Sequence, residues 1–350
     1  MDPNGSKENM CNKLSKQQCL RLLNAETFQR ITLSLYKYVN LENPHTLRDL
    51  LYSKWLKLGI LGRVYLANEG INAQVSVPEH NWDHFIGQLN SSKHFNNIPF
   101  KIAIENNKDP FFKLIIKVRN QIVADGLSEN EYDLTNVGTH LSAKEWNNAI
   151  NDGATIVDMR NHYESEIGKF KGAICPDAET FEEELPIVKD LLQGREDEQI
   201  LLYCTGGIRC EKTSAYLKHH CFKNVAQLHG GIIDYINQIK KDKNLENKFT
   251  GKNFVFDERL GEKITADIIS KCHQCGDSCD THVNCKNMNC NLLFLQCSKC
   301  QKKYENCCSI ECIQISHLPD EQYLKLRKGV DNKKIFYSHK KVALNLNKND

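Results

Sequence analysis

The sequence predicts a multidomain protein of classes α/β and α+β, in which an α+β domain precedes an α/β domain and a Cys-rich segment follows both. Three observations lead to this prediction. The chain has 350 residues, which is long for one ordinary domain. Its apolar residues alternate in the first third and form short runs between helical patterns in the middle. Ten of its 16 cysteines fall between Cys272 and Cys312.

The overall composition is that of a globular protein, with 40% hydrophobic and 26% charged residues. The formal net charge of +2 does not by itself indicate a polyanionic partner. No run of 18 apolar residues occurs, and the N-terminal residues MDPNGSKENM are polar, so the sequence predicts neither a transmembrane helix nor a secretory signal. We therefore expect a cytoplasmic protein without a membrane partner.

The first third predicts a ferredoxin-like domain over residues 29–120, after a polar leader over 1–28. ITLSLYKYV alternates like a strand, PHTLRDLLYSKWLKLG is an amphipathic helix opened by Pro44, and GRVYLANEGINAQVSV gives two strands. A second helix, PEHNWDHFIGQLNSS, and strands near 100–104 and 112–118 complete the series. Strand, helix, strand, strand, helix, strand is the ferredoxin-like order.

The middle third predicts an α/β domain over residues 135–245, after a polar, turn-rich connection. Ser142 and Glu145 form a capping box that opens a helix. Short apolar strands then alternate with helices in TIVDMR, FEEELPIVKDLLQG, QILLYC, NVAQLHGG and IIDYINQIKK. This alternation implies a parallel sheet covered on both faces.

Cys204 ends the apolar run QILLYC, where a strand gives way to a Gly-rich turn and a helix. Functional residues gather at the carboxyl ends of parallel strands. Gly206 and Gly207 allow backbone N–H groups to curve around the sulfur, and the helix N-terminus and Arg209 favour thiolate over thiol. These features predict a nucleophilic cysteine. The alternative is a buried cysteine that only closes the strand.

The loop from Cys204 to Arg209, which contains Thr205, Gly206, Gly207 and Ile208, resembles the active-site loop of rhodanese domains. TIVDMR with Asp158 and Arg160 as supporting residues, Tyr163 and Glu164, GKFKGA and HGG extend the match. Related phosphatases have a loop one residue longer, sized for phosphate. The resemblance therefore implies a persulfide on Cys204, stabilised by the loop amides and Arg209.

Cys210 occupies the position where many rhodaneses have serine or threonine. Three roles are open for it: resolving a persulfide, forming a redox couple with Cys204, or serving as a small residue at a helix start.

The Cys-rich segment over residues 265–318 has the short spacings of tetrahedral zinc ligands, as in Cys272-x2-Cys275 and Cys297-x2-Cys300. Four ligands per site allow two closed sites with two cysteines left over; the alternative is reduced cysteines in a small core. We expect structural zinc, because an all-thiolate site leaves no open position for substrate. The candidate ligands are Cys272, Cys275, Cys279, Cys285, Cys290, Cys297, Cys300, Cys307, Cys308 and Cys312.

Three further stretches surround YCTGGIRCEKTSAYL in this order: LGRVYLANEGINAQVSV, KVRNQIVADG with HLSAKEWN, and CHQCGDSCDTHVNCKNMNCNLLFLQCSKC with CCSIEC. Together they resemble the tRNA uridine(34) hydroxylase family from about Phe28 to Leu318. The resemblance implies a cytoplasmic tRNA-modifying oxidoreductase that converts wobble uridine 34 to 5-hydroxyuridine, with molecular oxygen as co-substrate. It also implies the tRNA anticodon loop as partner. The motifs name no electron donor or oligomeric state, and a persulfide donor is a further candidate partner.

The rhodanese loop alone predicts a sulfurtransferase, and a non-enzymatic interaction protein is a third alternative. For hydroxylation, our hypothesis is that the Cys204 thiolate or persulfide attacks C6 of the uracil. A tRNA surface could comprise the basic tail over 319–350, Lys113, Lys117, Arg119 and KKDKN at 240–244, although charge runs are usually only solvated. In NEGIN, Glu69 and Asn72 either face an interdomain cleft or belong to a simple turn around Gly70.

Overall fold

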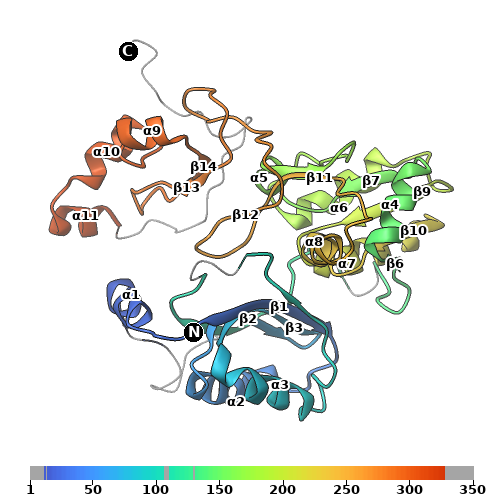
Figure 1. Ribbon diagram of the computed structural model, residues 1–350, viewed down its shortest axis with the longest axis horizontal. Coiled ribbons are helices and arrows are strands. Elements are labelled where there is room, and N and C mark those ends of the chain that lie inside the picture. Colours follow the sequence, from blue (N-terminus) through green and yellow to red (C-terminus); the bar gives the residue numbers. More distant parts are fainter. Residues whose placement is uncertain (1–11, 13, 106–109, 129–130, 328–350) are drawn as a thin grey trace.

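The computed structural model describes residues 12, 14–105, 110–128 and 131–327, and the basic tail beyond Arg327 lies outside these ranges. The described chain forms three lobes: an N-terminal α+β part, a central α/β part and a Cys-rich part (Figure 1). A short helix of the leader, α1(Lys16–Asn24), precedes the first lobe. No helix among the described residues is long and apolar enough to cross a membrane.

The N-terminal lobe contains one five-stranded sheet and two main helices. Its elements are β1(Arg30–Tyr38), α2(Pro44–Lys57), β2(Leu61–Ala67), β3(Gly70–Pro78), η1(Glu79–Asn81), α3(Trp82–Asn90), β4(Phe100–Ile102) and β5(Leu114–Val118). The strand order is β4-β1-β3-β2-β5, with β5 parallel to β2 and the other pairs antiparallel. The first four strands confirm the ferredoxin-like prediction, and β5 extends the sheet at one edge.

Side chains along these strands alternate between the core and the opposite face of the sheet. Leu33 and Leu35 of β1 and Ala73 of β3 are buried in the core with Trp55 and Phe85 of the two helices. Residues of opposite parity point to the other face of the sheet. On that face the register places Tyr36 beside Asn72, and Asn72 beside Tyr65. This second face is turned toward the central lobe.

The central lobe contains a four-stranded parallel sheet in the order β6-β10-β9-β7. Its elements are β6(Thr139–Leu141), α4(Ala143–Asn151), β7(Thr155–Asp158), α5(His162–Ser165), β8(Gly168–Phe170), α6(Phe181–Leu191), β9(Gln199–Tyr203), α7(Ile208–His219), β10(Asn224–Leu228) and α8(Gly231–Lys241). The predicted parallel sheet and the capping box of Ser142 with Glu145 are both present. Two apolar clusters cover the two faces: Leu201 and Tyr203 belong to one, and Ile200 and Leu202 to the other.

The C-terminal part is joined to the central lobe by strand pairing. β11(Phe249–Asn253) pairs antiparallel with β8 and with β12(Glu262–Lys263). The hairpin β13(His282–Asn284) and β14(Leu293–Leu295) follows, and then α9(Ser298–Lys303), α10(Ile310–Ser316) and α11(Asp320–Arg327).

Candidate active site

A cavity of about 420 Å³ lies between the N-terminal sheet and the central lobe. Cys204, Thr205, Gly206, Ile208 and Arg209 line it from the active-site loop predicted by the sequence. Tyr36, Tyr65, Asn72, Gln74 and Lys101 line it from the N-terminal lobe, and Phe256 and Arg259 from the C-terminal part. Residues far apart in the sequence therefore enclose Cys204.

The backbone around Cys204 curves toward its sulfur. The N–H group of Gly207 donates a hydrogen bond to Cys204 Sγ at 3.1 Å. Gly207 is the N-cap of α7 and has φ of 96°, in the left-handed region that favours glycine. A Cβ at Gly207 would lie only 2.9 Å from the hydroxyl of Tyr36. Both the turn and the approach of the N-terminal lobe therefore require glycine here.

The surroundings of Cys204 favour the thiolate. Burial alone would raise the pKa of this thiol, which is 1% exposed. A hydrogen bond from the Cys210 thiol, the charge of Arg209 and the backbone N–H groups of Arg209 and Gly207 outweigh burial and lower the pKa to about 6. Cys204 is consequently a thiolate at neutral pH, as a nucleophile requires.

Cys210 is fully buried behind Cys204 in the first turn of α7. Its thiol is a hydrogen-bond partner of Cys204, and burial followed by this contact raises the pKa of Cys210 well above its ordinary value. It keeps its proton while Cys204 loses one. This contact supplies a hydrogen-bond donor to the thiolate and leaves the two sulfur atoms adjacent.

Arg209 is held by a carboxylate that the sequence analysis named only as part of the rhodanese match. Its guanidinium forms two hydrogen bonds with Glu164, of 2.7 and 2.9 Å. The Glu164 side chain is completely buried, and that of Arg209 is 9% exposed. This pair fixes the guanidinium beside the sulfur on the cavity wall.

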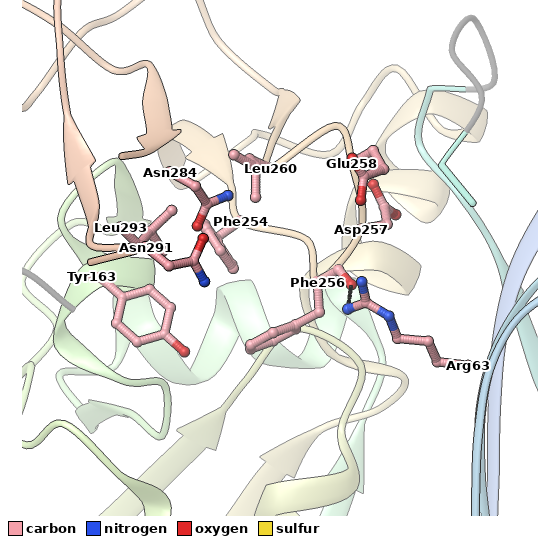
Figure 2. A pocket seen from close by; sticks show the side chains of 10 residues that line it. All are labelled: Arg63, Tyr163, Phe254, Phe256, Asp257, Glu258, Leu260, Asn284, Asn291 and Leu293. Carbon is pink, nitrogen blue, oxygen red and sulfur yellow. Dashed lines mark hydrogen bonds between the residues drawn. The ribbon is translucent and has the colours of Figure 1, made fainter. Parts of the chain in front are cut away.

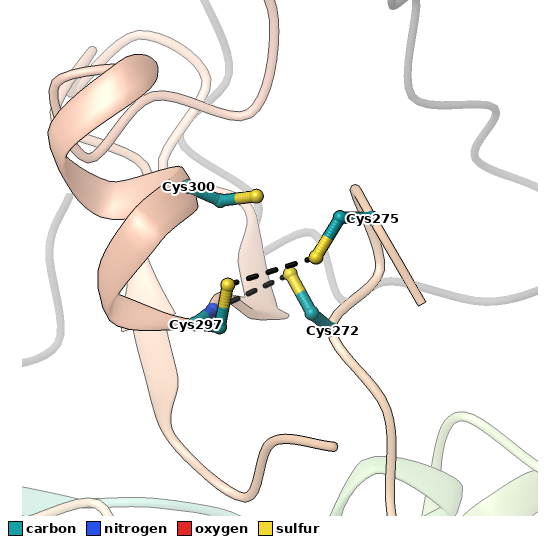
Figure 3. Close-up of side chains that lie close together, drawn as sticks. All are labelled: Cys272, Cys275, Cys297 and Cys300. Atoms are coloured by element: carbon teal, nitrogen blue, oxygen red, sulfur yellow. Dashed lines mark hydrogen bonds between the residues drawn. The ribbon is translucent and has the colours of Figure 1, made fainter. Parts of the chain in front are cut away.

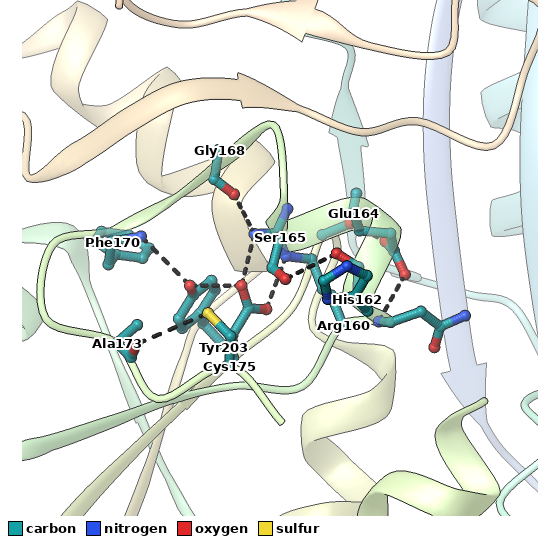
Figure 4. Close-up of polar contacts among 12 residues, drawn as sticks. Arg160, His162, Glu164, Ser165, Gly168, Phe170, Ala173, Cys175 and Tyr203 are labelled. Carbon is teal, nitrogen blue, oxygen red and sulfur yellow. Dashed lines mark hydrogen bonds and ion pairs between the residues drawn. The ribbon is translucent and has the colours of Figure 1, made fainter. Parts of the chain in front are cut away.

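Asp158 and Arg160, the expected supporting residues, are completely buried and are not among the residues that line the cavity. Figure 4 shows Arg160 in the polar network with Gly168 and Tyr203. Arg160 bonds both carboxylate oxygens of Asp158, at 2.8 and 2.7 Å, and the carbonyl of Gly168 at 2.6 Å. The hydroxyl of Tyr203 donates to Asp158 at 2.6 Å. Since Tyr203 immediately precedes Cys204, this buried network positions the end of β9.

The NEGIN turn fits the turn interpretation at Gly70, whereas the cleft interpretation fits Asn72 and not Glu69. Gly70 has φ of 146°, and a Cβ there would lie 2.0 Å from the carbonyl oxygen of Lys37, so the turn requires glycine. Asn72 also lines the cavity and donates to the carbonyl of Ile122 at 3.1 Å. Glu69 bonds the N–H group of Ile122 at 2.6 Å and does not line the cavity.

Apart from Asn72, the cavity residues from the other lobes were not predicted from the sequence. Lys101 is one of them and is buried, 6% exposed, with its Nζ 4.1 Å from the ring centre of Tyr36. Burial lowers the pKa of Lys101 to about 8. Strand alternation could have indicated which face Tyr36, Tyr65 and Lys101 occupy. It could not have indicated that this face meets Cys204.

A second, smaller cavity of about 160 Å³ adjoins the first (Figure 2). Arg63, Phe256 and Asp257 belong to the walls of both cavities. Arg63 donates to the carbonyl of Phe256 at 3.0 Å. The C-terminal part therefore contributes directly to the wall of the Cys204 cavity.

The structure gathers eight of the ten predicted metal ligands into two groups of four. Within each group all the sulfur atoms lie within 4.8 Å of one another. The first group is Cys272, Cys275, Cys297 and Cys300 (Figure 3), and the second is Cys285, Cys290, Cys308 and Cys312. The first group joins the pair Cys272 and Cys275 to the pair Cys297 and Cys300. The second joins Cys285 and Cys290 to Cys308 and Cys312, so the two groups alternate along the chain.

The spacing within these groups fits tetrahedral zinc. A Zn–S bond of about 2.3 Å places the sulfur atoms of a tetrahedron about 3.8 Å apart. The contacts Cys275–Cys297 and Cys290–Cys308 are both 3.6 Å, and Cys308–Cys312 is 3.7 Å. Cys279 and Cys307 are buried outside both groups. They are the two cysteines left over in the sequence-based count.

Two curated relatives cover nearly the whole chain. A protein of Leptospira interrogans is 53% identical over 95% of this chain and 90% of its own length. A protein of Yersinia pestis is 48% identical over 92% of this chain and 91% of its own length. Both are named tRNA uridine(34) hydroxylase. The chain belongs to this family.

Three family descriptions match successive parts of this hydroxylase-family chain. A "UPF0176 acylphosphatase like domain" matches residues 30–122, a "Rhodanese-like domain" matches 142–238, and "Rhodanase C-terminal" matches 250–313. They agree with the predicted α+β, rhodanese and Cys-rich parts. A solved rhodanese-like domain protein of Staphylococcus aureus is 21% identical over 28% of this chain and 90% of its own, with a TM-score of 0.24, too low to support an argument.

Proposed function

We propose that this chain hydroxylates C5 of uridine 34 in tRNA, with molecular oxygen as co-substrate and the Cys204 thiolate as nucleophile. The observation that supports the reaction is the near full-length identity of 53% and 48% to proteins named for it. The position of Cys204 supports its role, because its sulfur lies on the wall of a cavity large enough for a nucleoside.

The lining of the cavity suits one uracil base taken out of a stacked loop. Tyr65 and Phe256 offer aromatic rings. Asn72 and Gln74 on β3 add amide groups that could pair with the polar edge of uracil. Enzymes that modify a base hold it in such an enclosed pocket, and anticodon loops present unpaired bases.

The chemistry begins with addition of the Cys204 thiolate to C6 of the bound uracil. This addition makes C5 electron-rich, so that C5 can react with oxygen. Hydroxylation then consumes two electrons and two protons from a reductant and releases one water. Arg209 and the loop N–H groups stabilise the sulfur when it leaves as thiolate, as they do in the free protein.

Sulfur transfer from a persulfide donor is the second reaction that this loop could support. It uses the same Cys204 and the same loop groups, whereas the names of the relatives favour hydroxylation. A non-enzymatic interaction protein would have no need for a cysteine whose pKa is about 6.

We assign tRNA binding to positively charged side chains around the lobes. Lys113, Lys117 and Arg119 lie on or next to β5, at the edge of the N-terminal sheet. Lys240 and Lys241 lie at the C-terminal end of α8 in the central lobe. The proposal also includes the domain limits 29–120, 135–245 and 265–318. It further includes structural zinc in the last of these domains and action in the cytoplasm.

The test is incubation of the purified protein with an unmodified tRNA transcript, oxygen and a thiol reductant, followed by mass spectrometry of the nucleosides. Appearance of 5-hydroxyuridine at position 34 supports the proposal. A thiolated nucleoside instead would support sulfur transfer, and an unchanged tRNA, also in cells that overproduce the protein, would refute both.

A further inference from the structure

Tyr36 lines the same cavity as Cys204, although it belongs to β1 of the N-terminal lobe. Its hydroxyl approaches the active-site loop at Gly207, where only glycine leaves room for it. Lys101 Nζ lies 4.1 Å from the centre of its ring, and the ring of Tyr38 packs edge-on at 6.3 Å. These contacts fix the phenol close to the sulfur.

The hydrogen bond of Tyr36 has a defined direction. Its hydroxyl donates to Glu211 Oε1 at 3.0 Å. Burial opposes ionisation of Glu211, but hydrogen bonds from His140, Gln227 and Tyr36 lower its pKa below the ordinary value. Because the phenolic proton points at this carboxylate, the phenol oxygen presents lone pairs to the cavity.

The phenol also keeps its proton at neutral pH. Burial, and then the negative charges of Glu211 and Cys204, raise the pKa of Tyr36 well above its ordinary value. The Tyr36 oxygen can therefore accept a proton from a molecule in the cavity while the phenolic proton passes to Glu211.

His140 connects Glu211 to the surface. His140 Nε2 lies 2.9 Å from Glu211 Oε1, and the His140 side chain is 39% exposed. Gln227 donates to the other carboxylate oxygen at 2.8 Å and holds it in place. A hydrogen-bonded chain thus runs from the cavity through Tyr36, Glu211 and His140 to solvent.

We propose that Tyr36 accepts the proton from C5 of the bound base and passes its own proton to Glu211. This step rests on the proposed function and follows the arrival of oxygen at C5, while Cys204 is still bonded to C6. The C5–H bond breaks, its proton passes to the Tyr36 oxygen, and the Tyr36 proton passes to Glu211. The C–H electron pair forms the C5=C6 double bond, and the C6–S pair leaves with Cys204 as thiolate. The step needs no oxidant or reductant.

The experiment compares Tyr36→Phe with wild type on a tRNA transcript. We expect kcat for 5-hydroxyuridine to fall about 10²-fold, with KM for tRNA within about twofold. A covalent complex of protein and tRNA should accumulate on denaturing gels, and deuterium at C5 of the uridine should slow the variant more than wild type. Glu211→Gln should also lower kcat and cause the covalent complex to accumulate, because it removes the acceptor of the Tyr36 proton.

The matched control is Tyr38→Phe. Tyr38 lies two residues further along β1, and its hydroxyl donates to the carbonyl of Ile208 at 3.3 Å, but it does not line the cavity. This variant loses a similar interdomain hydrogen bond and should retain wild-type kcat, without an accumulated complex.

Two results would overturn the proposal: a Tyr36→Phe protein with undiminished kcat, or a slow one with no accumulated complex and no larger isotope effect. If the wild-type protein makes no 5-hydroxyuridine, the proposed function itself fails, and this step fails with it.

Discussion

The buried ammonium of Lys212 on α7 lies 2.8 Å from Glu69 Oε2 in the turn between β2 and β3. Lys212 also pairs with Asp125 of the connection between the lobes, and both of these side chains are completely buried. Helix α7 begins at the active-site loop, so this triad fixes the loop relative to the N-terminal sheet. The two walls of the Cys204 cavity are therefore joined by charge as well as by apolar packing.

Replacing Lys212 by methionine should destabilise this junction. The change leaves Glu69 and Asp125 without their cation, and breaking a buried ion pair in this way costs about 3–5 kcal/mol. We expect a lower Tm and faster proteolysis between the lobes. Lys223→Met is the control, because Lys223 pairs with Asp197 on the exposed surface. Equal melting temperatures for the two variants would show that the triad does not stabilise the junction.

Replacing Cys204 by serine should abolish hydroxylation. The hydroxyl is not ionised at neutral pH and cannot add to C6, so we expect the rate to fall at least about 10³-fold. Nucleoside mass spectrometry measures the product, and a binding assay with tRNA should show affinity close to wild type. Cys221→Ser, at an exposed cysteine, serves as control. Full hydroxylation by the Cys204→Ser protein would eliminate the nucleophilic mechanism.

Alkylation of Cys204 should depend on pH with a midpoint near 6. Its pKa is about 6, below the ordinary thiol value, so the thiolate forms as the pH rises through 6 and is lost below it. The iodoacetamide rate should level off above the midpoint and fall about tenfold per pH unit below it. Peptide mass spectrometry identifies the site. Cys210→Ala should move the midpoint upward, because it removes a hydrogen bond to the thiolate; a midpoint near 8.5 in the wild type would contradict the described surroundings.

The purified protein should contain two equivalents of zinc, one for each group of four cysteines. Cys272→Ser should remove one equivalent and Cys312→Ser the other, as measured by elemental analysis. Cys279→Ser and Cys307→Ser should keep both, since these cysteines lie outside the groups. Chelation should lower the Tm of the C-terminal part, because metal binding contributes to its folding. Equal metal content in all four variants would refute the two groups as ligand sets.

Local patterns in the sequence were sufficient to predict the elements and the turn that holds Cys204. The alternation in ITLSLYKYV predicted β1, and the order of strands and helices predicted the ferredoxin-like sheet. Cys204, Gly207 and Arg209 lie within six consecutive residues, so their geometry follows from one strand, one turn and one helix start. Interactions between residues this close in the chain can be inferred from the order of the residues.

Contacts between distant segments were decided only by the tertiary structure. Lys101 and Cys204 come from different lobes, and no periodicity in either segment indicates the other. The cysteines indicated the number of candidate metal sites but not the partition, because spacing along the chain does not show which pairs meet and only the fold brings Cys272 to Cys297 and Cys285 to Cys308. Sequence by itself determined the chemical character of the loop and its likeness to a known family. The packing of the lobes determined which side chains surround the sulfur, because burial and charge act through space rather than along the chain.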